Sequence, residues 1–278
     1  MKEASVFPEY FGFKNGERGT HSGRTIMLSE LRGLLQDLPP ESSVADYRAA
    51  VIEQNVLGKR TQSTRRETAQ RLRTLYGLDP SVTVFRGMRF FWEKDPPAQP
   101  LLALCCSLAR DPLLRLSMDL ILATPEGEKV SKTQIEHAVA EATLDVTSHR
   151  KSYASLAGGH ERFSPKTLSS IARNVSSSWT QSGYLKGRSF KYRTLPDVTV
   201  GNVAYAVLLG YLCGGRGRLL LDCVWVRLLG LSVGQVQSCL SDASGRGWLD
   251  YRGIGSVVEI RFPNLLTPEE QRWLDEQT

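Results

Sequence analysis

Apolar residues recur at helical spacing along most of this chain, and this pattern predicts a mainly α fold. Pro39 and Pro40 end the first helical run. Asp111 and Pro112 divide a long apolar run into two short helices, which we expect to form the central core. The predicted helices cover residues 27–38, 42–55, 59–76, 100–124 in two parts, 131–144 and 164–182.

Polar residues with cap-forming side chains precede several of these helices. Ser131 and Ser164 are the expected N-caps of the two later helices, and Pro165 suits a first helical position. Thr64 and Glu67 have the spacing of a capping box, in which each side chain bonds the backbone of the other residue. These residues therefore predict where three of the helices begin.

Short extended segments rich in β-branched or aromatic residues follow three of the helical runs. Residues 81–92, SVTVFRGMRFFW, predict a small hairpin that turns near Gly87. Residues 185–195 and 249–262 predict two further hairpins. In the last third, helical patterns at 203–215, 219–230 and 232–248 precede such a hairpin.

That order of helices followed by a hairpin is typical of a winged helix-turn-helix. The predicted fold class is therefore mainly α with short β-hairpin wings, in multiple winged helix-turn-helix-like units. A length of 278 residues exceeds the usual single domain. We divide the chain into an N-terminal helix-turn-helix-like basic unit at 1–97, a central helical core with a second basic winged-helix-like unit at 98–200, and a C-terminal winged-helix module at 201–278.

The formal net charge of +6 is concentrated in two segments. Residues 59–94 carry a net charge of +6 and residues 149–193 a net charge of +8, while the rest of the chain sums to −8. A concentrated positive charge creates a local field that attracts polyanions, whereas a uniform surplus affects only solubility. The charge pattern therefore predicts two basic surfaces that face nucleic acid.

The first basic segment combines a buried face with a cationic face. Residues 68, 69, 72, 75 and 76 share the apolar side of the predicted helix, and Arg66, Gln70 and Arg73 line another side. Arginine binds guanine edges or phosphates in bidentate fashion, and glutamine binds adenine. The DNA-contacting candidates here are Lys59, Arg60, Arg65, Arg66, Gln70, Arg71 and Arg73, with Arg86 and Arg89 on the predicted hairpin.

The predicted helix of the second basic segment also has an apolar face and a polar, cationic face. Leu168, Ile171, Ala172, Val175 and Trp179 form an apolar stripe, and small polar and cationic residues lie outside it. Small hydroxyl and amide side chains allow close approach to a sugar-phosphate backbone. The DNA-contacting candidates are Lys166, Ser170, Arg173 and Asn174 on the helix, with Lys186, Arg188, Lys191 and Arg193 on the hairpin.

The C-terminal unit has the helix and hairpin order that is most typical of a winged helix. It has no excess of positive charge, because residues 194 to 278 carry a net charge of −2. Its polar residues can still contact a groove, or the unit can contact protein or form a dimer, so these alternatives stay open. The groove-contacting candidates are Gln235, Gln237, Ser238, Ser241 and Arg252.

Signatures of catalysis or metal binding are missing from the sequence. There is no phosphate loop, no GxSxG elbow and no HExxH, and His21, His137, His149 and His160 have no metal-ligand spacing. The adjacent His21 and Ser22 do not specify a nucleophilic site. We therefore expect no enzymatic activity, no metal and no cofactor.

Cysteine usage and hydropathy predict a soluble cytoplasmic protein. Five cysteines in apolar surroundings, with no CxxC pair, suit small buried hydrophobic residues in a reducing compartment. The N-terminal residues lack the apolar region of a secretory signal. The longest apolar run, near residue 204, is shorter than the roughly 20 residues that span a bilayer.

Three stretches together resemble a known family. HSGRTIMLSELRGLL at 21–35, RTQSTRRETAQRLRTL at 60–75 and FSPKTLSSIARNVSSSWTQSGYL at 163–185 are similar to successive landmarks of the BrxA family, small helical components of BREX phage-defence systems. The resemblance covers roughly residues 20–200 and implies a non-enzymatic DNA-binding protein with helix-turn-helix character. It places the family's basic helix on Arg65, Arg66, Arg71 and Arg73, and it leaves the role of the module at 203–262 open.

We therefore expect a protein that binds double-stranded DNA mainly through the phosphate backbone, as an accessory component of a BREX-like system. One alternative is an adaptor whose basic faces bind acidic partner proteins, with the C-terminal module as a further protein contact. Another is a transcriptional repressor with a specific operator. RNA binding is disfavoured because the aromatic residues do not form the stacking signature of an RNA-recognition motif. The sequence leaves the oligomeric state open.

Overall fold

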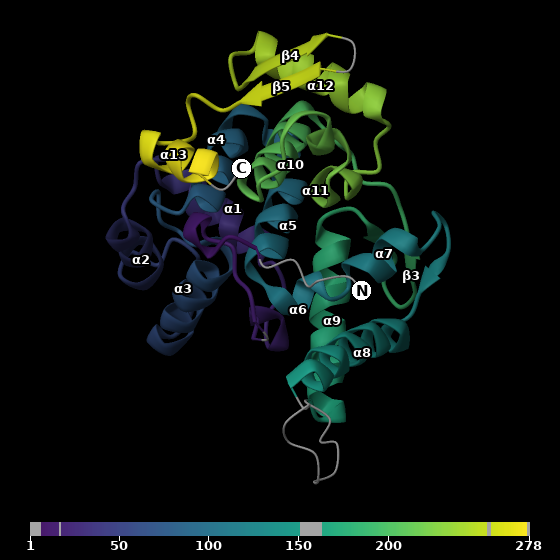
Figure 1. Ribbon diagram of the computed structural model, residues 1–278. Coiled ribbons are helices and arrows are strands. Elements are labelled where there is room, and N and C mark those ends of the chain that lie inside the picture. The colour runs from purple at the N-terminus through teal and green to yellow at the C-terminus, as the bar shows by residue number, and fades with distance from the viewer. Residues whose placement is uncertain (1–6, 17, 151–162, 255–256, 277–278) are drawn as a thin grey trace.

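Helices make up most of the fold, and two small antiparallel sheets complete it (Figure 1). The computed structural model describes residues 7–16, 18–150, 163–254 and 257–276. Residues 151–162, which include His160 and part of the second basic segment, lie outside the described residues, and so does the side chain of His149.

The N-terminal half of the chain is helical apart from one short strand. Three single-turn helices, η1, η2 and η3, lie among the longer ones. The elements are η1 (Glu9–Phe11), η2 (Thr20–Ser22), α1 (Leu28–Asp37), α2 (Val44–Ile52), α3 (Gln62–Tyr76), α4 (Thr83–Lys94), η3 (Pro96–Ala98), α5 (Gln99–Arg110), α6 (Pro112–Arg115), α7 (Met118–Ala123) and β1 (Lys129–Val130).

The C-terminal half contains the remaining helices and both hairpins. Strand β3 lies between β1 and β2 in one antiparallel sheet, and β4 pairs with β5 in the other. The elements are α8 (Lys132–Arg150), α9 (Pro165–Gln181), β2 (Leu185–Lys186), β3 (Lys191–Arg193), α10 (Val200–Leu212), η5 (Gly217–Asp222), α11 (Val224–Arg227), α12 (Val233–Gly245), β4 (Asp250–Ile254), β5 (Val257–Arg261) and α13 (Pro268–Glu276).

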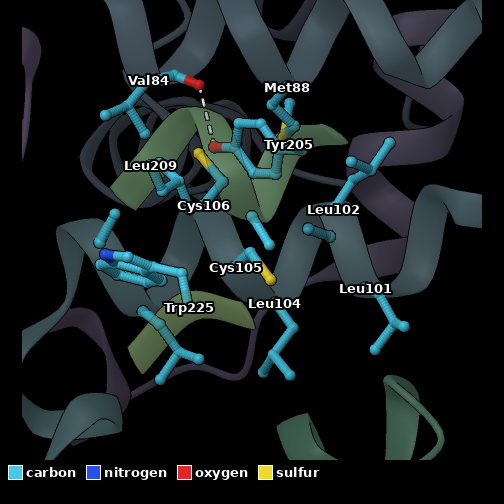
Figure 2. Packing of buried hydrophobic residues seen from close by; sticks show 14 of the residues in the cluster. Val84, Met88, Leu101, Leu102, Leu104, Cys105, Cys106, Tyr205, Leu209 and Trp225 are labelled. Atoms are coloured by element: carbon cyan, nitrogen blue, oxygen red, sulfur yellow. Dashed lines mark hydrogen bonds between the residues drawn. The ribbon is translucent and has the colours of Figure 1, made fainter. Parts of the chain in front are cut away.

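One hydrophobic core extends from Phe11 to Leu274 and passes through all three units that the sequence suggested. Helices α5 and α10 lie at its centre, and nearly every residue of both is buried. Figure 2 shows Cys105 and Cys106 of α5 packed near Tyr205 of α10, whose hydroxyl donates to the carbonyl of Val84 at 3.0 Å. Because this core crosses the proposed boundaries, the units are held against one another.

Several predicted elements are confirmed by the structure. Helices occur in each of the predicted helical runs, and the break between α5 and α6 falls at Asp111. The Ser164 hydroxyl accepts from the Thr167 amide and the Ser131 hydroxyl from the Gln134 amide, as expected of N-caps. The hairpins near residues 185–195 and 249–262 are present, and β1 joins the first of them as a third strand.

The hairpin predicted for residues 81–92 is wrong, because this segment is helix α4. Phe85, Met88 and Phe91 recur at helical spacing and are fully buried, so the apolar stripe outweighs the β preference of the single residues. Gly87 makes no turn. A Cβ there would lie 2.4 Å from a methyl carbon of Leu208, so glycine allows α4 and α10 to pack closely.

Two smaller expectations are wrong, and one helix was not predicted. The N-cap of α3 is Thr61, whose hydroxyl accepts from the Thr64 amide, and Thr64 lies inside the helix. Helix α13 was not predicted. Cys105 and Cys106 are buried and burial raises the pKa of each thiol to about 12, but Cys213 is exposed.

A buried carboxylate, that of Asp111, joins the N-terminal segment to the centre of the fold. Its Oδ2 accepts from the backbone amides of Thr20 and His21 and contacts His21 Nδ1 at 3.0 Å. Its Oδ1 accepts from the amides of Leu113 and Leu114, which caps α6. A buried charge with this many partners is compensated, so it links η2 to α6 firmly.

His21 extends this link to helix α9. Its Nε2 lies 2.8 Å from Ser178 Oγ, and its carbonyl accepts from the side-chain amide of Asn174 at 2.9 Å. Ser178 Oγ also accepts from the Ile26 amide. The inner side of α9 is therefore fixed to the N-terminal segment, and its outer side remains exposed.

We expect Asp111→Asn to lower the free energy of unfolding by about 1–3 kcal/mol, because the new amide group leaves part of the buried backbone amides around this position without an acceptor. Urea denaturation followed by circular dichroism measures the change. Asp119→Asn is the matched control, since Asp119 is exposed on α7 and should change stability by less than about 0.5 kcal/mol. Equal effects of the two substitutions would contradict the proposed link.

The pH dependence of stability in the wild type and in Asp111→Asn is a second test of this contact. Burial alone raises the pKa of Asp111, but the attraction and hydrogen bond of His21 and the amides of Leu114 and Thr20 hold it below its ordinary value of 3.8. A lowered pKa contributes stability at higher pH, and this contribution is lost as the pH falls through the folded-state pKa. The stability difference between wild type and Asp111→Asn should therefore shrink as the pH falls below about 4.

Candidate nucleic-acid interface

Helix α9 presents one apolar side and one polar side for reasons that are local in the sequence. Ser164 caps its first turn and Pro165 occupies the first helical position. Ile171, Val175 and Trp179 are fully buried, and the Trp179 indole donates to Ser117 Oγ at 2.8 Å. The opposite side consists of Lys166, Ser169, Ser170, Arg173, Ser176 and Ser177, all exposed or half-buried.

The small sheet beside α9 is closed by a tight turn between β2 and β3. Gly187 has a φ of +108°, and a Cβ there would lie 2.0 Å from the carbonyl oxygen of Phe190. Only glycine fits this turn without strain. The turn residues Arg188, Ser189 and Phe190 are exposed, and β1 adds Lys129 and Val130 to the free side of β3.

A groove of about 380 Å³ separates α9 from this sheet. Its cationic lining residues come from four elements, β1, α8, α9 and β3, and from the β2–β3 turn. No acidic residue is among the described residues that line it. We call it the basic groove. The basic groove is lined by Lys129, Val130, Ser131, Lys132, Ala172, Arg173, Ser176, Ser177, Arg188, Ser189, Phe190 and Lys191.

The five cations of the basic groove differ in how strongly they are engaged inside the protein. Lys132 pairs with Glu136 at 3.3 Å, and Lys191 Nζ donates to the Gly187 carbonyl at 2.6 Å. Arg173 donates to Ser170 Oγ at 3.2 Å, and Lys129 Nζ lies 4.0 Å from the centre of the Phe190 ring. Arg188 is exposed and has no ion-pair or hydrogen-bond partner among the described residues. These contacts leave most of the positive charge accessible to an anion.

Three of the eight candidates from the second basic segment line the basic groove, and three more are exposed or half-buried on α9 and β2. Arg173, Arg188 and Lys191 line the basic groove, Lys166 and Ser170 lie on α9, and Lys186 is exposed on β2.

Asn174 and Arg193 do not belong to this surface, because both bond backbone carbonyls within the fold. Asn174 donates to His21, and Arg193 donates to the carbonyls of Ile121 and Thr194 with only 6% of its surface exposed. They are therefore corrected to structural residues.

Lys129, Lys132 and the groove residues Ser131, Ser176 and Ser189 were not among the predicted contacts. Strand β1 has only two residues, too short for a periodic signal, and its pairing with β3 is a long-range contact. The sequence KVSK at 129–132 lies between two helices, where a winged-helix unit places a short strand that pairs with its hairpin. This position in the order of elements is the feature of the sequence from which Lys129 and Lys132 could have been predicted.

Three of the predicted contacts on the first basic segment are engaged with the protein itself. Lys59 pairs with Glu30 at 3.0 Å, and Arg71 lies 3.8 Å from Glu67. Arg65 donates to the carbonyls of Lys59 and Ile52, which ties the start of α3 to the end of α2. Arg65 therefore supports the packing of these two helices.

The remaining candidates on α3 border a hollow of about 240 Å³ between α2 and α3. Arg60 precedes α3 and is exposed. We call this hollow the α2–α3 pocket. Arg66, Gln70 and Arg73 form part of its wall, and Arg48 of α2 adds a third arginine. Its remaining lining residues are Val44, Tyr47, Ile52, Ala69 and Leu78.

Arg86 and Arg89, predicted on a hairpin, lie on helix α4 and point into the fold. Arg86 pairs with Glu270 at 2.5 Å and donates to the carbonyls of Leu265 and Pro80, which ties α4 to α13. Arg89 is 2% exposed and donates to the carbonyls of Leu35 and Leu38 at the end of α1. Both arginines are corrected to structural residues.

The C-terminal unit exposes a less basic surface. Gln235 completes a capping box with Ser232 at the start of α12, and Ser238, Ser241 and Arg252 are exposed. Gln237 is half-buried. None of these side chains adds a positive groove comparable to that beside α9 among the described residues.

The contacts of Asp111 with His21 and of His21 with Ser178 resemble those of a Ser–His–Asp triad. The burial of these side chains argues against catalysis by them. All three are at most 1% exposed. The Ser178 hydroxyl donates to the Asn174 carbonyl, so its proton is not directed at His21. A nucleophile must reach its substrate and pass its proton to the base, and neither condition is met here.

The described residues contain neither a cluster of metal-binding side chains nor a membrane-spanning helix. No group of three or more His, Cys, Asp or Glu side chains there is placed to hold a metal ion. Within the same ranges, no helix combines the length and the apolar composition needed to cross a bilayer.

Comparison of the chain with protein-family models found no matching family, and a search of curated proteins found no match either.

We expect Arg193→Met to lower the free energy of unfolding by about 1–3 kcal/mol, because it leaves two carbonyls without their donor. The matched control is Arg188→Met, which removes the same charge from an exposed turn and should change stability by less than about 0.5 kcal/mol. Urea midpoints compare the two. An equal loss in both variants would show that Arg193 is not bound as described.

Proposed function

We propose that this chain is a non-enzymatic protein that binds double-stranded DNA through helix α9 and the β2–β3 hairpin. The observation that supports the proposal most directly is the basic groove, in which five cations and four serines line one hollow. Cationic side chains neutralise phosphates and release counterions, which supplies most sequence-independent affinity for DNA. Serine side chains at 176 and 177 allow the backbone of the helix to approach the duplex closely.

The order of elements supports a winged helix-turn-helix for residues 118–193. Helix α7, strand β1, helices α8 and α9 and the β2–β3 hairpin follow one another, and β1 pairs with β3. In such units the last helix lies in the major groove and the hairpin contacts the neighbouring backbone. Helix α9 then serves as the recognition helix, and Arg188 at the hairpin turn contacts phosphate.

A second unit of the same order occupies residues 200–261, with α10, α11, α12 and the β4–β5 hairpin. Its lack of net positive charge favours a role other than DNA binding. The unit would contact a protein partner or serve as the scaffold that holds the central unit. The N-terminal unit has the helices α2 and α3 but no hairpin after them, since α4 takes that place. We assign winged-helix character to the central and C-terminal units only.

The role as accessory component of a BREX-like phage-defence system rests on the sequence resemblance over residues 20–200 alone. A transcriptional repressor would use the same surface but require a specific operator. Competition between labelled operator-like and random duplexes separates these roles, because a backbone binder discriminates weakly among sequences.

We expect the purified protein to bind a labelled random-sequence duplex with an affinity that falls steeply with salt. Arg173→Glu/Arg188→Glu should weaken binding by at least about tenfold and lower the salt slope by about two, because each lost phosphate contact lowers the slope by about one. Fluorescence anisotropy over a salt series measures both quantities, with circular dichroism to check the fold.

The matched control is Arg66→Glu/Arg73→Glu, which changes the net charge equally but alters the α2–α3 pocket. It should retain most of the affinity. If it loses binding while the α9 variant keeps it, the DNA surface lies on α3. If both variants bind like the wild type, the protein does not contact DNA through either surface.

The α2–α3 pocket favours a second candidate function, an adaptor that binds an acidic protein segment. Its floor contains Val44, Ile52, Ala69 and Leu78, and three arginines lie at its wall. Backbone phosphates do not require an apolar floor, whereas an acidic peptide with one large apolar side chain matches both features. The volume of about 240 Å³ suits a single side chain better than a whole small-molecule ligand.

Selection from a displayed random peptide library on the immobilised protein tests this function. We expect the selected peptides to carry acidic residues around one large apolar residue and to lose binding to Arg66→Glu/Arg73→Glu. Ala69→Leu should also weaken the binding of these peptides, because the larger side chain fills the pocket without a change of charge. Peptides without this pattern, or peptides that bind both variants normally, would contradict the adaptor role.

A further inference from the structure

The small sheet of the central unit has one buried face and one face that carries aromatic and cationic side chains. Tyr192 of β3 lies directly opposite Lys129 of β1 and Lys186 of β2 in the strand register. Cross-strand partners project from the same face of a sheet, so these three side chains share one face. Phe190 precedes β3 in the turn, and Lys129 Nζ lies 4.0 Å from the centre of its ring, which places the ring beside the same face. We call these four residues the outer sheet face.

The opposite face explains why the outer sheet face is not part of the core. Val130, Leu185 and Arg193 are buried on the inner side of the same strands. On the outer side, Phe190 is 56% exposed and Tyr192 is 40% exposed. Two aromatic side chains are therefore largely exposed to water near Lys129 and Lys186.

The chemistry of the outer sheet face matches unpaired nucleotides. Lys129 Nζ already lies 4.0 Å from the centre of the Phe190 ring, which shows that cations and rings are within reach of each other here. Proteins that bind single strands place aromatic rings for the bases beside cations for the backbone. In an intact duplex the base faces are stacked on each other, so exposed rings find stacking partners only where bases are unpaired.

The position of this face relative to the basic groove indicates which nucleic acid fits both. Lys129 and Phe190 belong to the outer sheet face and also line the groove beside α9. A duplex bound along α9 would therefore bring its end or its opened strand to the rings. The charge of both surfaces is positive, which favours nucleic acid over an apolar protein partner.

We propose that the outer sheet face binds unpaired bases, so that the protein prefers duplex DNA with a single-stranded overhang to a blunt duplex. This inference rests on the proposed binding of double-stranded DNA by α9 and the β2–β3 hairpin. Phe190 and Tyr192 stack on bases of the overhang, and Lys129 and Lys186 contact its phosphates.

Fluorescence anisotropy with the full-length chain tests the preference. The probes are a blunt duplex of about two helical turns and the same duplex with an overhang of roughly six nucleotides at its 3′ or 5′ end. Wild type should bind one of the overhang probes about tenfold more tightly than the blunt probe. Phe190→Ala/Tyr192→Ala should bind all probes as wild type binds the blunt duplex.

The control variant is Leu195→Ala, which removes another large exposed apolar side chain, 60% exposed, just beyond the same sheet. It should keep the full preference for the overhang. Thermal unfolding checks that all variants are folded, which is expected because the substituted side chains are exposed.

The outcomes separate this inference from the proposed function. Equal binding of blunt and overhang probes, or a preference that persists in Phe190→Ala/Tyr192→Ala, overturns the role of the outer sheet face and leaves duplex binding intact. Binding of overhang probes alone, lost in the aromatic variant, supports the outer sheet face and overturns duplex binding by α9. Absence of binding to every probe overturns both.

Discussion

The carboxylate of Asp111 is the contact on which the arrangement of this protein depends most. It receives backbone amides from η2 and from α6, and its contact with His21 continues to Ser178 of α9. Three segments distant in the sequence thus meet at one buried charge, which is stable only because its partners are complete. The inner side of α9 is fixed by this network and by Asn174, so the polar side of the helix is held toward the β2–β3 hairpin.

The positive charge of the chain serves two different purposes. Arg65, Arg86, Arg89 and Arg193 donate to backbone carbonyls and hold helices together, whereas Arg173, Arg188 and Lys166 remain accessible to solvent. A guanidinium has several donors in a fixed plane, which suits it to the unpaired carbonyls at helix ends as well as to phosphate. A basic segment of sequence is therefore an incomplete guide to a basic surface.

The two surfaces that carry free arginines differ in shape as well as in position. The basic groove combines cations and serines with the exposed ring of Phe190, and these features support the proposed binding of DNA. The α2–α3 pocket combines arginines with an apolar floor, which matches an acidic protein segment. A protein with both surfaces would bind DNA at one side and a partner at another, as an accessory component of a larger assembly would need to do.

Helical spacing, N-caps and the break at Asp111 were sufficient to place most helices and the two hairpins, because these features depend on residues close in sequence. The sequence also placed the positive charge on the segment that contains α9 and the β2–β3 hairpin. It did not distinguish a helix from a hairpin at residues 81–92, where the packing of Phe85 and Met88 decides, and it did not separate Arg193 from Arg188. It missed Lys129 and the outer sheet face, since a two-residue strand exists only through its pairing with β3. Local periodicity determined the elements, and long-range packing decided which of their polar side chains reach solvent, because burial depends on neighbours that lie far away in the chain.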